Sequence, residues 1–231
     1  MLTNWDKLPD RMKIPEVRPY YDILKKRRVS LFVKRAFDLL AAALLLVLLA
    51  IPMLIIAVWI KTDSDGPVFY RQERVTKDGK HFRIHKFRTM VVNADQIGTA
   101  VTVGNDKRIT KSGAILRRLR LDELPQLLDV LDGNMSFVGT RPEAVKYVEL
   151  YKPEYYATLL MPAGITSEAS IRYKDEDKLL SAADDVDRVY MEKVLPEKMK
   201  WNLEEIRSFA LFSELLTMFR TVAAVCGREY K

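Results

Sequence analysis

The sequence contains few of the residues that crosslink a chain or bind transition metals. Cys226 is the single cysteine among 231 residues. No disulfide can therefore form within the chain, and a protein that faces the reducing cytosol is the simpler interpretation. His81 and His85 are the only histidines. Without a cluster of cysteines and histidines we expect no zinc site.

Acidic residues are fewer than basic ones, with 31 Asp and Glu against 38 Lys and Arg, so the formal net charge is +7. This excess suits an anionic partner, whether nucleic acid, a lipid headgroup or a phosphorylated substrate. It is equally consistent with a basic surface that only maintains solubility. The length suits one domain of ordinary size with a small appendage, and the chain has no internal repeat.

Charge is absent from the stretch between Leu39 and Ile60, which consists mostly of Leu, Ala, Val and Ile. Such a run is long enough to cross a bilayer as a helix. A helix in the core of a soluble protein is seldom apolar on every face over that length, so we expect membrane insertion. A signal peptide fits less well, because the charged stretch before the run is long and no small-residue cleavage site follows it.

Two features bear on how this segment lies in the membrane. Basic residues flank it on both sides, namely Lys25, Lys26, Arg27, Arg28, Lys34 and Arg35 before it and Lys61, Arg71, Arg74 and Lys77 after it. Because positively charged loops stay in the cytoplasm, both ends are drawn to the same face. Pro52 lies inside the run, where it removes a helical hydrogen bond and bends the helix. A re-entrant helix satisfies both features, whereas a kinked spanning helix explains Pro52 alone, and the residues themselves leave both open.

These patterns divide the chain into three parts. Residues 1–30 are polar, contain several prolines and are predicted to form an arm with little regular structure of its own. Residues 31–62 are the membrane-inserted helix, broken at Pro52. Residues 63–231 are expected to form a small domain that faces the cytosol and ends in amphipathic helices.

Secondary structure in the third part follows from the local patterns. Residues 68–75 and the alternating residues 81–87 flank a Lys-Asp-Gly-Lys turn, which predicts a β-hairpin. Beyond residue 90 the pattern is mostly helical, with helices expected over about 112–120, 123–131, 142–160, 176–182, 185–200 and 203–225. The expected fold class is therefore α+β and mainly helical.

Several of the expected helices mix aromatic, aliphatic and basic side chains, notably at residues 145–151, 155–160 and 209–220. Such a mixture suits a helix that lies at the headgroup level of a membrane. Packing against other helices explains the same spacing equally well. Both interpretations stay open for each helix.

Two carboxylates, Asp122 and Glu123, stand side by side just before Pro125. Proline is tolerated in the first turn of a helix but not in its interior, so a new helix is predicted to begin here with Asp122 near its N-cap. This gives the pair a structural interpretation, because Asp is a favoured N-cap and Glu suits the first turn.

The same pair also has a functional interpretation. At a broken helix start two carboxylates can converge on one Mg²⁺, which takes its other ligands from water and substrate phosphates. Arg117, Arg118 and Arg120 lie just upstream, where they would bind phosphate oxygens and keep the acids ionised. An ionised Asp122 can also attack phosphorus directly.

Two further motifs carry basic residues. Lys86-Phe87-Arg88-Thr89-Met90 follows the predicted hairpin, and the stretch that begins at Gly133 ends in Arg141-Pro142-Glu143. The second motif places a guanidinium at a helix start, where free backbone N–H groups also attract anions. Taken alone, Arg88 and Arg141 are as readily explained as surface or ion-pair residues.

The order of the motifs on one chain is more specific than any single motif. The blocks are Lys34–Asp38, Asp65–Gln72, Phe82–Met90, Ile109–Gly113, Leu121–Leu127, Met135–Glu143 and Pro162–Thr166. From about Val33 to about Phe219 the sequence thereby resembles the bacterial sugar transferase family, also called monotopic phosphoglycosyl transferases. The short N-terminal arm is similar to that of the small class, which has the catalytic core without extra spanning helices.

The resemblance implies a two-step reaction at the cytoplasmic face of the bacterial inner membrane. Asp122 would attack the β-phosphorus of a UDP-sugar and release UMP, and undecaprenyl phosphate would then capture the phospho-sugar. Glu123 is implied as the Mg²⁺ ligand. Residues assigned to substrate binding are Lys86, Arg88, Arg117, Arg118, Gln126, Arg141, Pro142 and Glu143. A homodimer is compatible with this reading, and nucleic acid is not an expected partner because no recognised binding motif is present.

The sequence departs from the family pattern at two places. Ile51-Pro52 stands where the family has a Ser-Pro pair at the break of its re-entrant helix, and Thr140 replaces the first proline of the usual Gly-Pro-Arg-Pro. Neither departure touches Asp122 or Glu123. The alternative hypothesis is a membrane-anchored protein that binds anionic lipids or polyphosphates without chemistry, and the intact pair of carboxylates argues against it.

Overall fold

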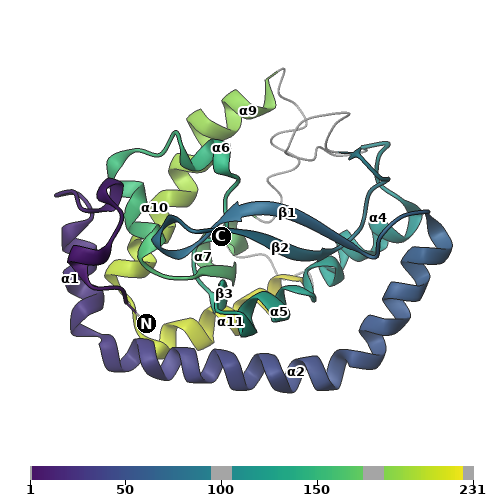
Figure 1. Ribbon diagram of the computed structural model, residues 1–231, viewed down its shortest axis with the longest axis horizontal. Coiled ribbons are helices and arrows are strands. Elements are labelled where there is room, and N and C mark those ends of the chain that lie inside the picture. The colour runs from purple at the N-terminus through teal and green to yellow at the C-terminus, as the bar shows by residue number, and fades with distance from the viewer. Residues whose placement is uncertain (1, 95–105, 174–184, 226–231) are drawn as a thin grey trace.

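The computed structural model describes residues 2–94, 106–173 and 185–225 (Figure 1). Within these ranges the helices are α1 (Arg18–Lys26), α2 (Arg28–Asp63), α4 (Lys111–Arg118), α5 (Gln126–Leu131), α6 (Val145–Val148), α7 (Glu168–Arg172), α9 (Val186–Val189), α10 (Leu195–Arg207) and α11 (Leu211–Val225). The strands are β1 (Phe69–Val75), β2 (His81–Phe87), β3 (Met135–Val138) and β4 (Ala163–Thr166). The described chain is mainly helical, as the sequence predicts, and has two small sheets.

The predicted hairpin is confirmed. Strands β1 and β2 pair antiparallel from Phe69 opposite Phe87 to Val75 opposite His81. The Asp-Gly pair forms the turn, with positive φ at Asp78 (57°) and Gly79 (70°), conformations that short polar residues and glycine adopt most readily.

The second sheet is not predicted by the sequence. Strands β3 and β4 pair in parallel, with Met135 opposite Ala163 and Val138 opposite Thr166. Gly139, just after β3, lies very close to Gly164 of β4, since a Cβ added to Gly164 would lie 2.2 Å from the carbonyl oxygen of Gly139. Each strand is only four residues long and buried, so neither shows the alternation that identifies a half-exposed strand.

Helix boundaries differ from the predicted ones where proline and capping residues interrupt the chain. The helix expected over 142–160 is two pieces, α6 and a 3₁₀ helix, Pro153–Leu160. The sequence predicts a break between the helices over 185–200 and 203–225. In the structure the break lies at 208–210, between α10 and α11. The helix predicted over 176–182 lies outside the described residues.

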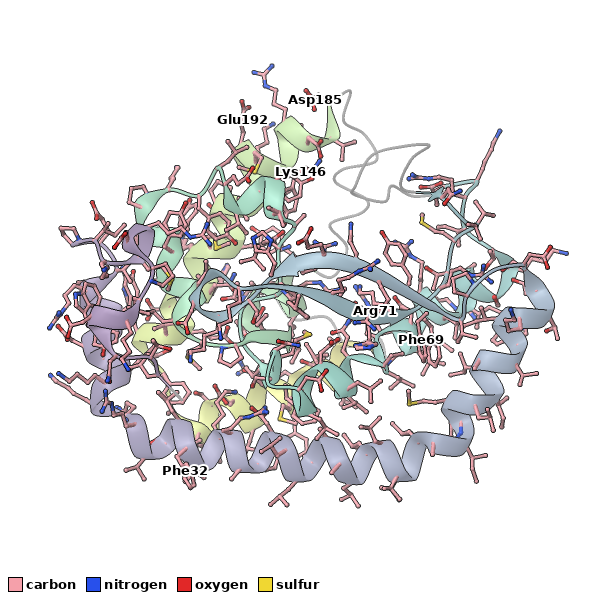
Figure 2. The ribbon with its side chains drawn as sticks, in the orientation of Figure 1. Phe32, Phe69, Arg71, Lys146, Asp185 and Glu192 are labelled. Atoms are coloured by element: carbon pink, nitrogen blue, oxygen red, sulfur yellow. The ribbon has the colours of Figure 1, made fainter. Side chains whose placement is uncertain are left out.

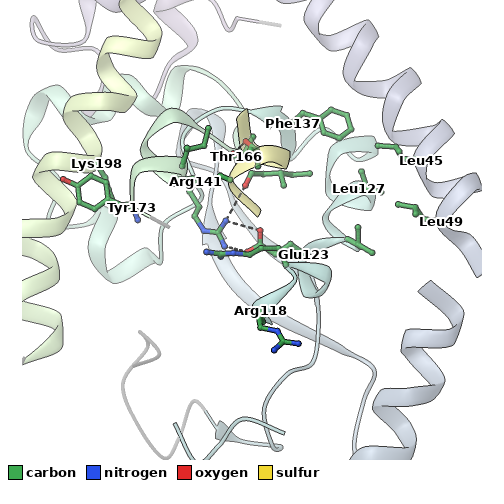
Figure 3. A pocket seen from close by; sticks show the side chains of 17 residues that line it. Leu45, Leu49, Arg118, Glu123, Leu127, Phe137, Arg141, Thr166, Tyr173 and Lys198 are labelled. Atoms are coloured by element: carbon green, nitrogen blue, oxygen red, sulfur yellow. Dashed lines mark hydrogen bonds and ion pairs between the residues drawn. The ribbon is translucent and has the colours of Figure 1, made fainter. Parts of the chain in front are cut away.

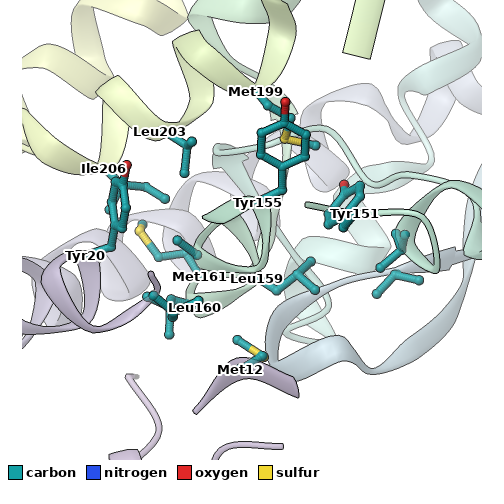
Figure 4. Packing of buried hydrophobic residues seen from close by; sticks show 14 of the residues in the cluster. Met12, Tyr20, Tyr151, Tyr155, Leu159, Leu160, Met161, Met199, Leu203 and Ile206 are labelled. Atoms are coloured by element: carbon teal, nitrogen blue, oxygen red, sulfur yellow. The ribbon is translucent and has the colours of Figure 1, made fainter. Parts of the chain in front are cut away.

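The N-terminal arm has more regular structure than its composition suggests, so that prediction is wrong. Two 3₁₀ turns, Trp5–Lys7 and Asp10–Met12, precede α1. Tyr20 and Leu24, one turn apart on α1, are buried in the same core as Tyr155 and Ile206 (Figure 4). The arm is therefore packed onto the domain formed by the later part of the chain.

The apolar segment forms one long helix, α2, which runs along one side of the domain and changes direction along its length (Figure 1). Pro52 lies inside it. Its most apolar window has a mean hydropathy of 3.1, and by length and composition it could cross a membrane. One face packs on the domain through Ala42, Ile56 and Ile60. Side chains on other faces point outward, as Phe32 does (Figure 2).

Both ends of α2 are attached to the domain by polar contacts. Near the start, Lys34 Nζ donates to the carbonyl of Val138 (3.0 Å), and the Asp38 carboxylate accepts from Ser136 Oγ (2.8 Å). At the far end the Asp63 carboxylate accepts from the backbone N–H (2.9 Å) and hydroxyl (2.8 Å) of Ser112. These contacts fix the apolar helix relative to α4 and β3.

Candidate active site

The two carboxylates lie in a short 3₁₀ turn, Leu121–Glu123, between α4 and α5. Arg120 adopts the left-handed conformation (φ 56°), which ends the preceding helical stretch. The predicted break is therefore present, but Asp122 is not the N-cap. That position is held by Pro125, because the 3₁₀ turn separates Asp122 from the first residue of α5.

Glu123 is surrounded by cations. Arg141 donates to both carboxylate oxygens, at 3.3 Å to Oε2, and Lys86 Nζ lies 3.2 Å from Oε1. Arg120 is more distant, at 3.9 Å. Burial opposes ionisation, but the charges of Arg141 and Lys86 outweigh it and hold the pKa of Glu123 well below its usual range. Glu123 is therefore a carboxylate at neutral pH.

Asp122 has the opposite character. It is 8% exposed, and its Oδ1 has no hydrogen-bond partner among the described residues. Burial raises the pKa of Asp122, while the charge of Lys86 works in the other direction. Gln126, four residues further on, is 1% exposed, and neither atom of its amide has a described partner. Buried polar groups are normally paired, so these two side chains are exceptions, and neither lines the cavity described next.

A cavity of about 470 Å³ opens beside Glu123 (Figure 3). Its two ends differ in chemistry. Leu45 and Leu49 of α2, together with Leu127 and Phe137, form an apolar end, and Tyr173 and Lys198 lie on the opposite side. Glu123 and Arg141 lie between these ends, so the cavity connects the apolar helix to a polar, basic region.

The cavity wall suits a phosphorylated ligand. Arg118, Arg120, Arg141 and Lys198 line it, and Lys86 reaches Glu123 from β2. Arginine and lysine are the side chains that bind phosphate oxygens most often, arginine through paired N–H donors. With Glu123 as the single lining carboxylate, the described part of the wall is strongly positive.

Not every residue predicted to bind substrate lies at this cavity. Arg117 does not line it, but its charge favours the ionised form of Asp122. Arg88 is buried and donates instead to the turn after α2, at 2.7 Å to the carbonyl of Ser64 and also to that of Asp65. In this structure Arg88 therefore fixes the end of α2, close to Gly66.

Arg141 lines the cavity, whereas the next two residues, Pro142 and Glu143, do not. The carbonyl of Pro142 accepts from Arg74 (3.4 Å), and the Glu143 carboxylate accepts from the Tyr190 hydroxyl (2.7 Å). Lys198 lies 3.8 Å from Glu143, so this buried carboxylate helps to place a lysine of the cavity wall.

Sequence reasoning missed several residues of the cavity. Arg120 is not among them, because it belongs to the arginine cluster expected to bind phosphate oxygens, and it lines the cavity. Tyr173, just after α7, and Lys198 of α10 lie by contrast far along the chain and carry no local motif. Their position depends on tertiary packing.

Comparison with known proteins decides which family this site represents. A family model described as bacterial sugar transferase matches residues 29–228. The chain belongs to the bacterial sugar transferase family. The match includes α2, both sheets and the whole cavity, so the site described above lies within the family's region of similarity.

Several curated members of the sugar transferase family are similar in sequence. The chain is 35% identical over 197 residues to the UDP-N-acetylgalactosamine-undecaprenyl-phosphate N-acetylgalactosaminephosphotransferase of Aeromonas hydrophila, covering 84% of this chain and 44% of the relative. It is 37% identical over 221 residues to the UDP-glucose:undecaprenyl-phosphate glucose-1-phosphate transferase of Escherichia coli K12, covering 94% and 44%.

A shorter relative is covered along most of its length. The exopolysaccharide production protein ExoY of Rhizobium meliloti is 33% identical over 215 residues, covering 87% of this chain and 88% of that protein. The chain thus spans less than half the length of the first two relatives and nearly all of the third.

Proposed function

We propose that this sugar transferase moves a phospho-sugar from a UDP-sugar to undecaprenyl phosphate through a covalent intermediate on Asp122 and releases UMP. The observation that carries the proposal is the buried Asp122, which has an unpartnered oxygen beside the cations that surround Glu123. The names of two relatives, which give UDP-sugars and undecaprenyl phosphate as their substrates, support it.

In the first step a carboxylate oxygen of Asp122 attacks the β-phosphorus of the donor. An oxygen–phosphorus bond to Asp122 forms, and the bond from that phosphorus to the bridging oxygen breaks, so that UMP leaves with the bridging oxygen and its electron pair. Arg141 and Lys86 would stabilise the phosphate charge during this transfer, because both contact Glu123, the residue that follows Asp122.

In the second step a phosphate oxygen of undecaprenyl phosphate attacks the same phosphorus. The bond to Asp122 breaks, and the carboxylate is regenerated as the diphosphate-linked sugar forms. The two ends of the cavity suit this order. Leu45 and Leu49 lie where a polyprenyl chain would enter from the membrane, and the basic side, which includes Lys198, suits the nucleotide donor.

Magnesium is the cofactor that the family resemblance implies. No group of three or more His, Cys, Asp or Glu side chains that could hold a metal ion occurs in the described ranges. Mg²⁺ usually takes only one or two protein carboxylates and completes its shell with water and substrate phosphates. Glu123 and the unpartnered Oδ1 of Asp122 fit that requirement. Bound there together with the donor, the ion would neutralise phosphate charge.

The experiment that tests the proposal is a release assay. Detergent-solubilised protein is incubated with Mg²⁺, undecaprenyl phosphate and each of a panel of UDP-sugars, and UMP is measured. We expect UMP from at least one donor, at a rate that depends on the acceptor. A protein that binds these ligands without releasing UMP would instead fit the alternative of a non-catalytic anion-binding protein.

The raised pKa of Asp122 predicts a pH dependence. The nucleophile must be ionised, so kcat/KM should fall as the pH drops through the pKa of Asp122, at a pH above the ordinary aspartate value of about 3.9. The charge of Lys86 lowers this pKa. Lys86→Met should therefore move the acidic limb of the pH–rate profile to higher pH, as measured by UMP release.

Lys80→Met serves as the matched control, because Lys80 is exposed at the turn of the same hairpin. Its acidic limb should coincide with that of the wild type. An acidic limb of Lys86→Met that stays in place or moves to lower pH would show that Lys86 does not set the ionisation of Asp122.

We further propose that α2 is re-entrant and that both of its ends lie at the cytoplasmic face of the inner membrane. Residues 2–27 precede α2 and pack into the same core as α10, while Asp63 at the other end binds Ser112. A helix that spanned the bilayer would separate these two attachments. The outward side chains of α2 supply the lipid-facing surface, with Val47 77% exposed and Ile51 72% exposed.

Cysteine labelling tests this topology. Glu16→Cys in the arm and Glu192→Cys before α10 are placed singly in a Cys226→Ala background, since both native side chains are exposed. Neither cysteine should react with a membrane-impermeant thiol reagent in intact spheroplasts, and both should react after lysis. Labelling of Glu16→Cys alone in intact spheroplasts would mean that α2 spans the membrane.

A further inference from the structure

A second cavity, of about 310 Å³, lies between α7, α10 and α11, next to the turn at Gly139 and Thr140. Among the described residues, none lines both this cavity and the one beside Glu123. The mechanism above assigns it no role. Several polar atoms of its wall can accept further hydrogen bonds.

Besides Thr140, four hydroxyl groups line the wall, and these four are left as acceptors. Thr158 donates its proton to the carbonyl of Tyr155 (2.7 Å), and the other three do the same within or beside their own helices: Ser208 to Glu204 (2.8 Å), Ser213 to Ala210 (2.7 Å) and Thr217 to Ser213 (3.1 Å). A hydroxyl has one proton and two lone pairs. With that proton used, each oxygen can only accept a further bond.

Two stronger acceptors lie on the same wall. Asn202 is 3% exposed, and its Oδ1 has no partner within the described part of the chain. Glu205 accepts one bond from the backbone N–H of Glu168 (3.2 Å) and makes no ion pair with any described residue. Burial, together with the like charges of Glu214 and Glu168, raises the pKa of Glu205 to about 7. Glu205 is half-buried, and the charge that favours its ionised form, that of Lys34, is already paired with Glu214.

The neighbouring carboxylates already have cations. Glu214 pairs with Lys34 at 2.5 Å. Glu168 pairs with Arg172 at 2.9 Å and with Arg220 at 3.5 Å. Glu204, the fourth carboxylate of the wall, pairs with Arg207 at 3.6 Å. Glu205 is therefore distinguished from the other three, and a ligand that satisfies it must bring both positive charge and N–H donors.

The cavity adjoins a surface suited to lipid. Leu216 and Arg220, one turn apart on α11, both line it and are both partly exposed, each at 41%. Further apolar side chains are exposed along α11, namely Phe212, Leu215, Phe219 and Val222. Glu214 of the same helix is bonded to Lys34 at the start of α2, so α11 lies beside the membrane helix (Figure 1). A ligand here would have an apolar portion along α11 and an anionic group near Arg220.

We propose that this cavity binds the headgroup of a phospholipid that carries a primary ammonium, such as phosphatidylethanolamine. The ammonium lies at Glu205 and Asn202, the phosphate lies at Arg220, and the acyl chains follow the exposed apolar side chains of α11. A primary ammonium has three N–H donors for these acceptors. A quaternary ammonium has none, so phosphatidylcholine should not replace it.

Native mass spectrometry of the full chain tests this site. The protein is released from nanodiscs of phosphatidylglycerol that contain equal mole fractions of phosphatidylethanolamine and phosphatidylcholine. We expect wild-type protein to retain phosphatidylethanolamine over phosphatidylcholine by about tenfold or more, the ratio that one charge-assisted hydrogen bond supplies. Soluble glycerophosphoethanolamine, which has the headgroup without acyl chains, should not displace the lipid at equal concentration.

Two variants and a control assign the binding to this wall. Glu205→Gln keeps the side-chain shape and should lose the preference for phosphatidylethanolamine. Asn202→Leu removes the second acceptor of the ammonium and should also lose this preference. Glu149→Gln, an exposed carboxylate that lines neither cavity, should bind like the wild type. Equal retention of the two lipids by the wild type, an unchanged preference in both variants, or displacement by glycerophosphoethanolamine would each overturn the proposal.

Discussion

Asp122→Asn should reduce UMP release by about four orders of magnitude. The amide has nearly the shape of the carboxylate but carries no charge and is a poor nucleophile, so the first bond to phosphorus does not form. Losses of roughly 10⁴ or more are typical when a group that acts directly in covalent catalysis is removed. Initial rates of UMP release, measured with saturating UDP-sugar, Mg²⁺ and undecaprenyl phosphate, provide the comparison.

The matched control is Asp132→Asn, which makes the same chemical change at an exposed residue just after α5. It should retain the wild-type rate within about twofold. The Asp122→Asn variant is expected to fold, because Oδ1 of Asp122 makes no hydrogen bond to a described residue that the substitution could break. Circular dichroism of both variants checks this. Wild-type-like UMP release from a folded Asp122→Asn protein would rule out Asp122 as the nucleophile.

Glu123→Gln should produce two opposite effects. Turnover should fall by roughly a hundredfold or more, because the carboxylate proposed to hold Mg²⁺ at the donor phosphates is lost. Binding of UMP in the absence of metal should become severalfold tighter. In the structure the Glu123 carboxylate forms ion pairs with Arg141 and Lys86. In Glu123→Gln this negative charge is lost, so both cations are available to a phosphate.

Calorimetric titration of UMP in chelator separates these effects from a general loss of structure. A misfolded protein would lose turnover and UMP affinity together. Glu149→Gln again serves as the control and should change neither quantity. A Glu123→Gln protein that has the wild-type circular dichroism spectrum but binds UMP more weakly than the wild type would mean that Arg141 and Lys86 do not bind the donor phosphates.

Local signals in the sequence predicted the parts of the fold that local physics determines. The Asp78-Gly79 turn, with alternating strands on either side, was sufficient for the hairpin. Pro125 was sufficient for a break in the helix beside the carboxylates. The charge-free run predicted α2, since such a run is long enough to form one apolar helix.

Features that depend on tertiary contacts could not be predicted in this way. The arm is rich in proline and charge, yet α1 forms because Tyr20 and Leu24 are buried against α10. The β3–β4 pair joins two four-residue strands from separate parts of the chain and is stabilised by close approach at Gly139 and Gly164. Neither short segment has a period long enough to identify it.

The same distinction between local signals and tertiary contacts holds for the residues of the candidate site. Asp122, Glu123, Lys86 and Arg141 were chosen from motifs, and the structure brings them together because β2, the 3₁₀ turn and the segment after β3 meet there. Lys198 was not chosen, because it lies on α10, far along the chain, and reaches the cavity wall through tertiary packing that no local motif indicates.

Intact-mass spectrometry of the protein incubated with UDP-sugar and Mg²⁺, without undecaprenyl phosphate, tests the covalent mechanism most directly. The predicted result is a mass increase equal to one phospho-sugar, located on the peptide that contains Asp122, absent from Asp122→Asn and removed when undecaprenyl phosphate is added. The contradicting result is an active enzyme that shows no such adduct and releases UMP only when both substrates are present, as direct transfer within a ternary complex would require.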